Sequence, residues 1–266
     1  MLTFGELFAG IGGFSLGLER AGMDCKWQVE IDDYARRVLQ KHWPDVRRHD
    51  DVRTFPPTGD DYSVDVICGG FPCQDISVAG KGAGLAGARS GLWYEFARII
   101  GELRPRYIIV ENVAALLSRG METVLGDLST LGYDAEWHVI PASAVGAPHR
   151  RDRVWIVAYA VSERDAVRRD GETMPPALAC WRCDARGSVS DCGAGCSQKP
   201  RQAASDAKGA AIRPWWQTEP AVGRVVNGVP HRVDRLRCLG NAVVPQVVEL
   251  IGKAIMEREH GNPIQR

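Results

Sequence analysis

Short apolar runs alternate with amphipathic stretches over the first 160 residues of the chain. Runs of this length, bounded by turn residues, are typical of strands, and an apolar position every three or four residues is typical of helices. The predicted strands are Leu2–Leu7, Lys26–Glu30, Val64–Cys68, Tyr107–Val110, Ala135–Ile140 and Val154–Ala158. The predicted helices are Gly13–Ala21, Asp33–His42, Leu92–Leu103 and Glu122–Leu131. Strands that alternate with helices predict a doubly wound α/β fold with a mostly parallel sheet.

The alternation breaks down between residue 161 and about residue 220. Gly, Ser, Ala, Arg and Cys dominate this stretch, which predicts a loop-rich region or a small lobe. Order returns afterwards, and Pro245–Glu257 predicts a closing helix. We therefore expect a first domain over 1–160, a variable region over 161–220, and a C-terminal segment over 221–266 that returns to the first domain.

Charge and hydropathy narrow the cellular setting. The 33 basic and 33 acidic side chains cancel, but residues 150–240 hold 16 Lys/Arg and 10 Asp/Glu, so an anionic partner would meet the later half. The sequence contains no run of about 18 apolar residues, so we expect no transmembrane helix. The N-terminus lacks the basic and long apolar regions of a signal peptide. We expect a cytoplasmic protein with reduced cysteines.

A glycine-rich loop, Phe8-Ala9-Gly10-Ile11-Gly12-Gly13-Phe14, joins the first strand to the first helix. Such a loop lets the backbone approach a ligand closely, although a tight structural turn explains it too. The spacing is not G-x-G-x-x-G, which argues against a nicotinamide-dependent oxidoreductase. Glu30 ends the second strand, where an acid commonly binds ribose hydroxyls, and Asp51 could accept a hydrogen bond from an adenine amino group. Either acid could equally be a solvated surface residue.

Two further loops follow apolar strands. Gly69-Gly70-Phe71-Pro72-Cys73-Gln74 follows the third predicted strand, and ligands of an open α/β sheet bind at the carboxyl ends of strands. Cys73 could be a nucleophile there, or a small buried hydrophobe. Glu111-Asn112-Val113 follows the strand Tyr107–Val110, so Glu111 could donate a proton beside the cysteine or merely complement a helix dipole.

Taken together, these motifs resemble those of the DNA (cytosine-5)-methyltransferase family. FAGIGGF resembles the family's cofactor loop, GGFPCQ its nucleophile loop and ENV its glutamate motif, and HRRDRVWIVA and LGNAVVP at 239–245 continue the same order. The match extends from residue 4 to about residue 255 and leaves only about 161–220 uncovered. The compact length is similar to that of phage, prophage and restriction-modification enzymes. The resemblance implies a Rossmann-like S-adenosylmethionine-dependent methyltransferase fold with a small target-recognition lobe.

The resemblance also implies a role for each matching residue. The catalytic residues would be Cys73, Glu111, Arg151 and Arg153, supported by Pro72, Gln74 and Asn112. The S-adenosylmethionine pocket would comprise Phe8, Ala9, Gly10, Ile11, Gly12, Gly13, Glu30, Ile31, Asp51, Val52, Leu92, Asn241 and Ala242. Two positions depart from the family pattern: Ile31 stands where an aromatic residue often stacks on adenine, and His149 stands where the basic motif usually has glutamine.

The implied activity is methylation of carbon 5 of cytosine within a short sequence of duplex DNA. Cys73 would form a covalent adduct with a base flipped out of the helix. Arg153 would hold the pyrimidine oxygen, Arg151 would position Cys73 or the DNA backbone, and the segment 75–91 would close over the base. A monomer is expected, and a cognate restriction endonuclease is a possible partner.

The variable region contains Cys180, Cys183, Cys192 and Cys196. Four cysteines at such spacing in a reducing compartment resemble a zinc knuckle, although the eight-residue gap is short for paired ribbons. Ordinary reduced thiols are the other interpretation. Two other functions also stay open: an RNA cytosine methyltransferase with the same fold, and a non-catalytic DNA-binding regulator. The presence of Cys73, Glu111 and Arg153 argues against the regulator.

Overall fold

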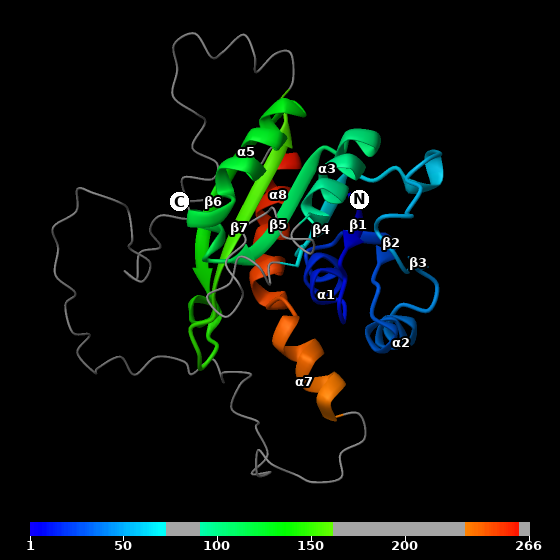
Figure 1. Cartoon of the computed structure of the whole chain (residues 1–266), viewed down its shortest axis with the longest axis vertical. Helices are drawn as coiled ribbons and strands as arrows, with labels where there is room; N and C mark the ends of the chain where they lie inside the picture. Colours follow the sequence, from blue (N-terminus) through cyan, green and yellow to red (C-terminus); the bar gives the residue numbers. More distant parts are fainter. Residues whose placement is uncertain (73–90, 162–231, 261–266) are drawn as a thin grey trace, which may run out of the picture.

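The computed structural model describes residues 1–72, 91–161 and 232–260, and its centre is a seven-stranded sheet (Figure 1). The strand order is β3-β2-β1-β4-β5-β7-β6. The strands are β1 (Thr3–Leu7), β2 (Asp24–Val29), β3 (Arg47–His49), β4 (Val66–Gly69), β5 (Tyr107–Val113), β6 (Tyr133–Pro141) and β7 (Asp152–Ala160). The pairings among β1 to β5 are parallel, whereas β7 runs antiparallel to both β5 and β6. The predicted mostly parallel α/β sheet is confirmed.

Helices cover both faces of this sheet. The helices of the described residues are α1 (Gly13–Arg20), α2 (Asp33–His42), α3 (Leu92–Leu103), α4 (Leu116–Arg119), α5 (Met121–Thr130), α7 (Arg232–Asn241) and α8 (Pro245–Glu259), with short 3₁₀ turns η1 (Asp60–Tyr62) and η3 (Ala142–Val145). Alternate residues of β5 enter different cores: Ile108 packs with residues of α3 and α5, and Ile109 packs with residues of α1 and α8. Figure 1 shows α8 behind the sheet and α3 and α5 in front of it.

The predicted end of the fourth apolar strand at Val110 is wrong. β5 continues through Val113 because the antiparallel neighbour β7 supplies partners, pairing Glu111 with Trp155 and Val113 with Arg153. Glu111 and Asn112 are therefore strand residues, although they still lie at the carboxyl end. The region 161–220 lies outside the described residues apart from residue 161, so the division of the chain into three parts remains a prediction.

One described segment, Val233–Glu259, is long and apolar enough to cross a membrane by length and composition alone. It consists of two helices, α7 and α8, and Pro245 begins the second of them. The face of α8 that carries Val248 and Ile251 is buried in the core beneath the sheet. A core helix passes the same length and composition test, and core packing accounts for most of the apolar residues of α8, although Leu250 is 47% exposed.

The contact between α1 and α8 depends on a glycine. A Cβ atom at Gly17 would lie 2.5 Å from Val248 Cβ and 2.6 Å from the Pro245 carbonyl oxygen, too close for either helix to accept without moving. We expect Gly17→Ala to lower the free energy of unfolding by about 1–3 kcal/mol through overpacking. Gly126→Ala is the matched control, because open space surrounds that helical glycine, and it should stabilise by about 0.5–1 kcal/mol. Chemical denaturation measures both; equal effects would contradict the packing argument.

Candidate active site

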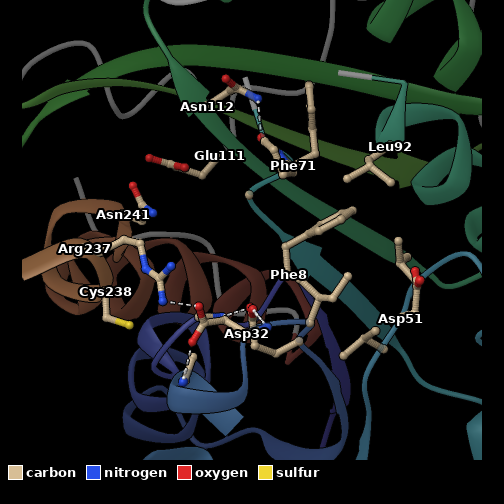
Figure 2. Close-up of a pocket in the computed structure, with 18 of the residues that line it drawn as sticks. Phe8, Asp32, Asp51, Phe71, Leu92, Glu111, Asn112, Arg237, Cys238 and Asn241 are labelled. Carbon is tan, nitrogen blue, oxygen red and sulfur yellow. Dashed lines mark hydrogen bonds and ion pairs between the residues drawn. The ribbon is translucent and has the colours of Figure 1, made fainter. Parts of the chain in front are cut away.

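A pocket of about 340 Å³ opens at the carboxyl ends of the parallel strands (Figure 2). The loops after β1, β2, β3 and β4 each contribute to its lining. The end of β5 contributes Glu111, Asn112 and Val113, and Arg153 comes from the start of the antiparallel strand β7. Helix α7, which comes just before the last helix α8, supplies a further wall. This edge is where an open α/β sheet binds its ligands.

Most of the predicted site residues share this single pocket. Those that line it are Phe8, Gly10, Glu30, Ile31, Asp51, Val52, Pro72, Leu92, Glu111, Asn112, Arg153 and Asn241. Those that do not line it are Ala9, Ile11, Gly12, Gly13, Ala242 and Arg151. Cys73, Gln74 and the segment 75–90 lie outside the described residues. Residues predicted for the cofactor and residues predicted for catalysis therefore face one cavity.

The glycine-rich loop owes its shape to left-handed backbone conformations. Phe8, Gly10 and Gly12 have φ angles of 54°, 55° and 83°. A Cβ at Gly12 would also meet the Trp43 ring at 2.4 Å, so both conformation and space require glycine there. Gly12 therefore shapes the turn, while Phe8 and Gly10 face the pocket.

Glu30 connects this loop to the loop after β2. Its two carboxylate oxygens accept hydrogen bonds from the backbone N–H groups of Gly10 (2.6 Å) and Asp32 (2.7 Å). Burial raises the pKa of Glu30, and the two backbone hydrogen bonds oppose that rise. A carboxylate has about four lone-pair positions, so acceptor capacity remains for the hydroxyl groups of a ribose.

The opposite side of this end of the pocket carries Asp51 and several apolar side chains. Asp51 accepts hydrogen bonds from the backbone N–H and the Nε of Arg53, and these bonds lower the pKa of Asp51. Ile31 is 62% exposed although it is apolar, which suits a face that a ligand covers. Glu30 and Asp51 can accept hydrogen bonds from ribose hydroxyls and from an adenine amino group, and apolar side chains line the pocket with them, so the residues present fit S-adenosylmethionine.

At the other end of the pocket, the buried Glu111 forms an ion pair with the partly exposed Arg153. Arg153 Nε lies 3.0 Å from Glu111 Oε1. Burial raises the pKa of Glu111 to about 7, although Arg153 and Arg151 both oppose that rise. A carboxyl group with this pKa can hold or release a proton near neutral pH, as a general acid or base must.

The loop that leads to Cys73 is fixed from β5. The side-chain amide of Asn112, which is buried, donates to the Phe71 carbonyl at 3.2 Å. A Cβ at Gly70 would lie 2.9 Å from Glu111 Oε2, so glycine allows this loop to pass close to the glutamate. Pro72 lines the pocket, and Cys73 is the next residue along the chain.

Several residues that line the pocket belong to no sequence motif, so their place in the site could not be predicted from the sequence. Asp32 follows β2 and Arg237 lies in α7, 205 positions later, yet the two form an ion pair (Figure 2). Cys238 lines the same wall. Only the fold brings these positions together, so sequence reasoning had no signal for them. Gly70, Phe71 and Gly240 could have been included, because they lie within the quoted GGFPCQ and LGNAVVP motifs.

Beneath the glycine-rich loop, Glu6 of β1 is fully buried. It accepts hydrogen bonds from the backbone N–H of Ser15 (3.2 Å) and from the Ser15 hydroxyl, and Gln28 donates to that hydroxyl at 2.8 Å. Desolvation still dominates and raises the pKa of Glu6 to about 8. Glu6 is therefore a neutral acid at neutral pH in the folded protein.

Glu6 makes folding depend on pH. Its folded pKa of about 8 exceeds the ordinary value of 4.5, so the folded state binds the proton more tightly than the unfolded state. The free energy of unfolding should therefore fall, by on the order of a few kcal/mol, as pH rises from about 4.5 through about 8. Glu111 acts with the same sign. Glu6→Gln should flatten this slope in denaturation series; an unchanged slope would contradict the assignment.

The residues that the structure describes contain no group of three or more His, Cys, Asp or Glu side chains able to hold a metal ion. Cys180, Cys183, Cys192 and Cys196 lie outside those residues.

Comparison with known proteins identifies the family to which this geometry belongs. The model of the C-5 cytosine-specific DNA methylase family matches residues 2–180 of the 266-residue chain. The type II methyltransferase M.HhaI of Haemophilus parahaemolyticus is 33% identical over 162 residues, covering 59% of this chain and 49% of the relative. M.Eco47II of Escherichia coli is 41% identical over 159 residues, covering 58% of this chain and 38% of the relative. The chain thus spans about half or less of the length of these relatives.

Solved structures agree. An Escherichia coli prophage protein, described as a DNA modification methyltransferase, is 28% identical with a TM-score of 0.52, covering 65% of this chain and 49% of that one. Spodoptera frugiperda DNMT2, in a triple-mutant form, is 23% identical with a TM-score of 0.51, covering 60% and 50%, and that likeness concerns the fold alone. Because the family's model matches more than half of the chain, the protein belongs to the C-5 cytosine-specific DNA methylase family.

Proposed function

We propose that this protein transfers a methyl group from S-adenosylmethionine to carbon 5 of cytosine in a short sequence of duplex DNA. One observation carries the proposal. A single pocket joins the acids suited to a nucleoside cofactor, Glu30 and Asp51, to the Glu111–Arg153 pair and to Pro72, the residue before Cys73. Donor and acceptor can thus meet within one cavity. Membership of the family supports the same reaction.

The cofactor, when bound, supplies the methyl group. Phe8, Val52 and Leu92 form apolar walls that would exclude water from it, and Glu30 would hold the ribose hydroxyls. Asp51 would accept a hydrogen bond from the adenine amino group. These assignments concern binding and orientation only.

Catalysis would begin with attack of the Cys73 thiolate on carbon 6 of a cytosine flipped out of the duplex. The new sulfur–carbon bond pushes electrons toward carbon 5 and ring N3. Glu111, neutral below a pKa of about 7, would donate its proton to N3, and Arg153 would hold the pyrimidine oxygen. Arg153 has five N–H donors, so its pairing with Glu111 leaves others for the base. After carbon 5 takes the methyl group, carbon 5 loses its proton to solvent. The Cys73 thiolate then departs, the N3 proton returns to the Glu111 carboxylate, and the aromatic ring is restored.

The proposal is tested with methyl-labelled S-adenosylmethionine and purified protein, offered duplex DNA of mixed sequence or transfer RNA. We expect label in DNA, recovered as 5-methylcytosine. Label in transfer RNA alone would favour an RNA methyltransferase, and no label in either would favour a non-catalytic regulator. Bisulfite sequencing of DNA from cells that express the protein would then reveal the target sequence. That sequence can be compared with the cleavage site of a cognate restriction endonuclease.

The division of labour along the chain belongs to the same proposal. Residues 1–160 would bind cofactor and catalyse, 161–220 would recognise the target sequence, and 221–266 would complete the catalytic domain. We also propose a cytoplasmic monomer, which size-exclusion chromatography with light scattering would test for oligomeric state.

Zinc binding by Cys180, Cys183, Cys192 and Cys196 would supply folding energy to a glycine-rich region with few aliphatic residues. Removal of the metal should then weaken DNA binding and spare S-adenosylmethionine binding. Elemental analysis of the purified protein checks this, with near-stoichiometric zinc expected. Metal-free protein that methylates DNA normally would identify the cysteines as ordinary thiols.

A further inference from the structure

The helix α7 forms one wall of the pocket, yet few of its apolar side chains pack against the other residues that the structure describes. Arg237, Cys238, Gly240 and Asn241 line the cavity. The apolar side chains of the same helix face outward: Val233 is 78% exposed, Leu236 57% and Leu239 64%. Polar contacts must therefore do much of the positioning of this wall.

Arg151 makes two of these contacts, although it does not line the pocket itself. Its Nη2 donates to the carbonyl oxygens of Gly240 at 2.8 Å and Ala242 at 2.7 Å. These carbonyls lie at the C-terminal end of α7, where backbone oxygens lack partners within the helix and a positive charge is favourable. The last turn of α7 contains no basic residue of its own. Arg151, just before β7, supplies that charge from another part of the chain.

The local structure around Arg151 is costly to maintain. Its φ angle is 43°, a left-handed conformation that residues with a side chain adopt rarely. Its guanidinium group is half-buried, and this desolvation lowers the pKa of Arg151. A strained backbone and a partly buried charge persist when the surrounding contacts require them. The hydrogen bonds from Arg151 to the Gly240 and Ala242 carbonyl oxygens are contacts that can stabilise this strained, partly buried residue.

A second contact fixes the same wall against the other side of the pocket. Arg237 of α7 forms an ion pair with Asp32. Asp32 caps α2 through a 3.0 Å hydrogen bond from Ala35 N, and its own backbone N–H donates to Glu30. The α7 wall is thus held at its C-terminal end by Arg151 and near its middle by the loop that carries Glu30.

We propose that Arg151 is a positioning residue for the cofactor: it holds the α7 wall in place and so sets the affinity for S-adenosylmethionine. The proposal rests on the proposed function and changes one assignment, since the family resemblance implied a role for Arg151 at Cys73 or on the DNA backbone. Arg153, two residues further on, would act on the base. One short segment would then serve both ends of the pocket.

The test is calorimetric titration of the DNA-free protein with S-adenosylhomocysteine. We expect Arg151→Met to raise the Kd by roughly tenfold or more, as expected for loss of hydrogen bonds from a charged donor. Arg151→Lys keeps a cation near the end of α7 and should lose less affinity. The matched control is Arg150→Met, because Arg150 is the preceding residue and its side chain is 84% exposed. Its Kd should equal that of the wild type.

Each outcome decides a different claim. An unchanged Kd for S-adenosylhomocysteine in folded Arg151→Met, together with a loss of DNA affinity, would overturn the positioning role. It would indicate instead that Arg151 contacts the DNA backbone. If Arg151→Met does not fold, Arg151→Gln, which also removes the charge, takes its place, and wild-type affinity in that folded variant would overturn the proposal as well. Wild-type protein that binds no S-adenosylhomocysteine would contradict the proposed function itself.

Discussion

Cys73→Ser should abolish methyl transfer to DNA and leave cofactor affinity nearly unchanged. A serine hydroxyl is a far weaker nucleophile than a thiolate, so no covalent bond to carbon 6 would form and carbon 5 would stay unreactive. The residues suited to the cofactor, among them Glu30 and Asp51, belong to other loops. A single-turnover assay with labelled cofactor measures the first effect, and calorimetry measures the second.

The paired measurements separate two explanations for loss of activity. Retained cofactor binding with no methyl transfer would support a nucleophilic Cys73. Substantial turnover by the serine variant would exclude that role. Loss of cofactor binding together with activity would indicate that Cys73 supports the pocket instead.

Glu111→Gln should slow the chemical step by on the order of a hundredfold or more, because the amide cannot transfer a proton to the ring. The wild-type rate should also fall as pH rises past about 7, since burial raises the pKa of Glu111 to about 7 and the neutral acid is lost above it. The glutamine variant should lack this decline. Single-turnover rates across a pH series measure both effects.

Glu122→Gln provides the matched control, because Glu122 is an exposed acid of α5 away from the pocket. It should keep both the wild-type rate and the wild-type pH profile. If Glu111→Gln instead weakened cofactor binding and left the chemical step intact, Glu111 would belong to the cofactor wall.

Sequence periodicity was sufficient for the sheet and for most of its helices. The runs around Ile67, Ile108 and Ile156 are apolar because helices cover both faces of the sheet, so each run has a strong signal. The three-residue edge strand β3, Arg47–His49, has no apolar run, so its sequence signal is weak. The extension of β5 to Val113 depends on pairing with β7, which no local pattern encodes.

The candidate site divides in the same way. Phe8, Glu30 and Glu111 follow from their places at strand ends and from motif resemblance, and all three line the pocket. Asp32 and Arg237 could not be predicted, because their ion pair arises only when α7 packs near the end of β2. The carbonyl contacts of Arg151 likewise join residues about ninety positions apart. Motifs indicate the chemistry, whereas long-range packing decides which side chains support it.

Covalent trapping tests the central claim most directly. Duplex DNA of mixed sequence, with 5-fluorocytosine in place of cytosine, is incubated with the protein and S-adenosylmethionine. Fluorine at carbon 5 cannot leave as a proton does, so the final elimination is blocked. We predict a covalent complex that forms only with cofactor and whose digest carries a methylated fluorocytosine on Cys73. Normal methylation of ordinary DNA without such a complex, or an adduct on another residue, would contradict the mechanism.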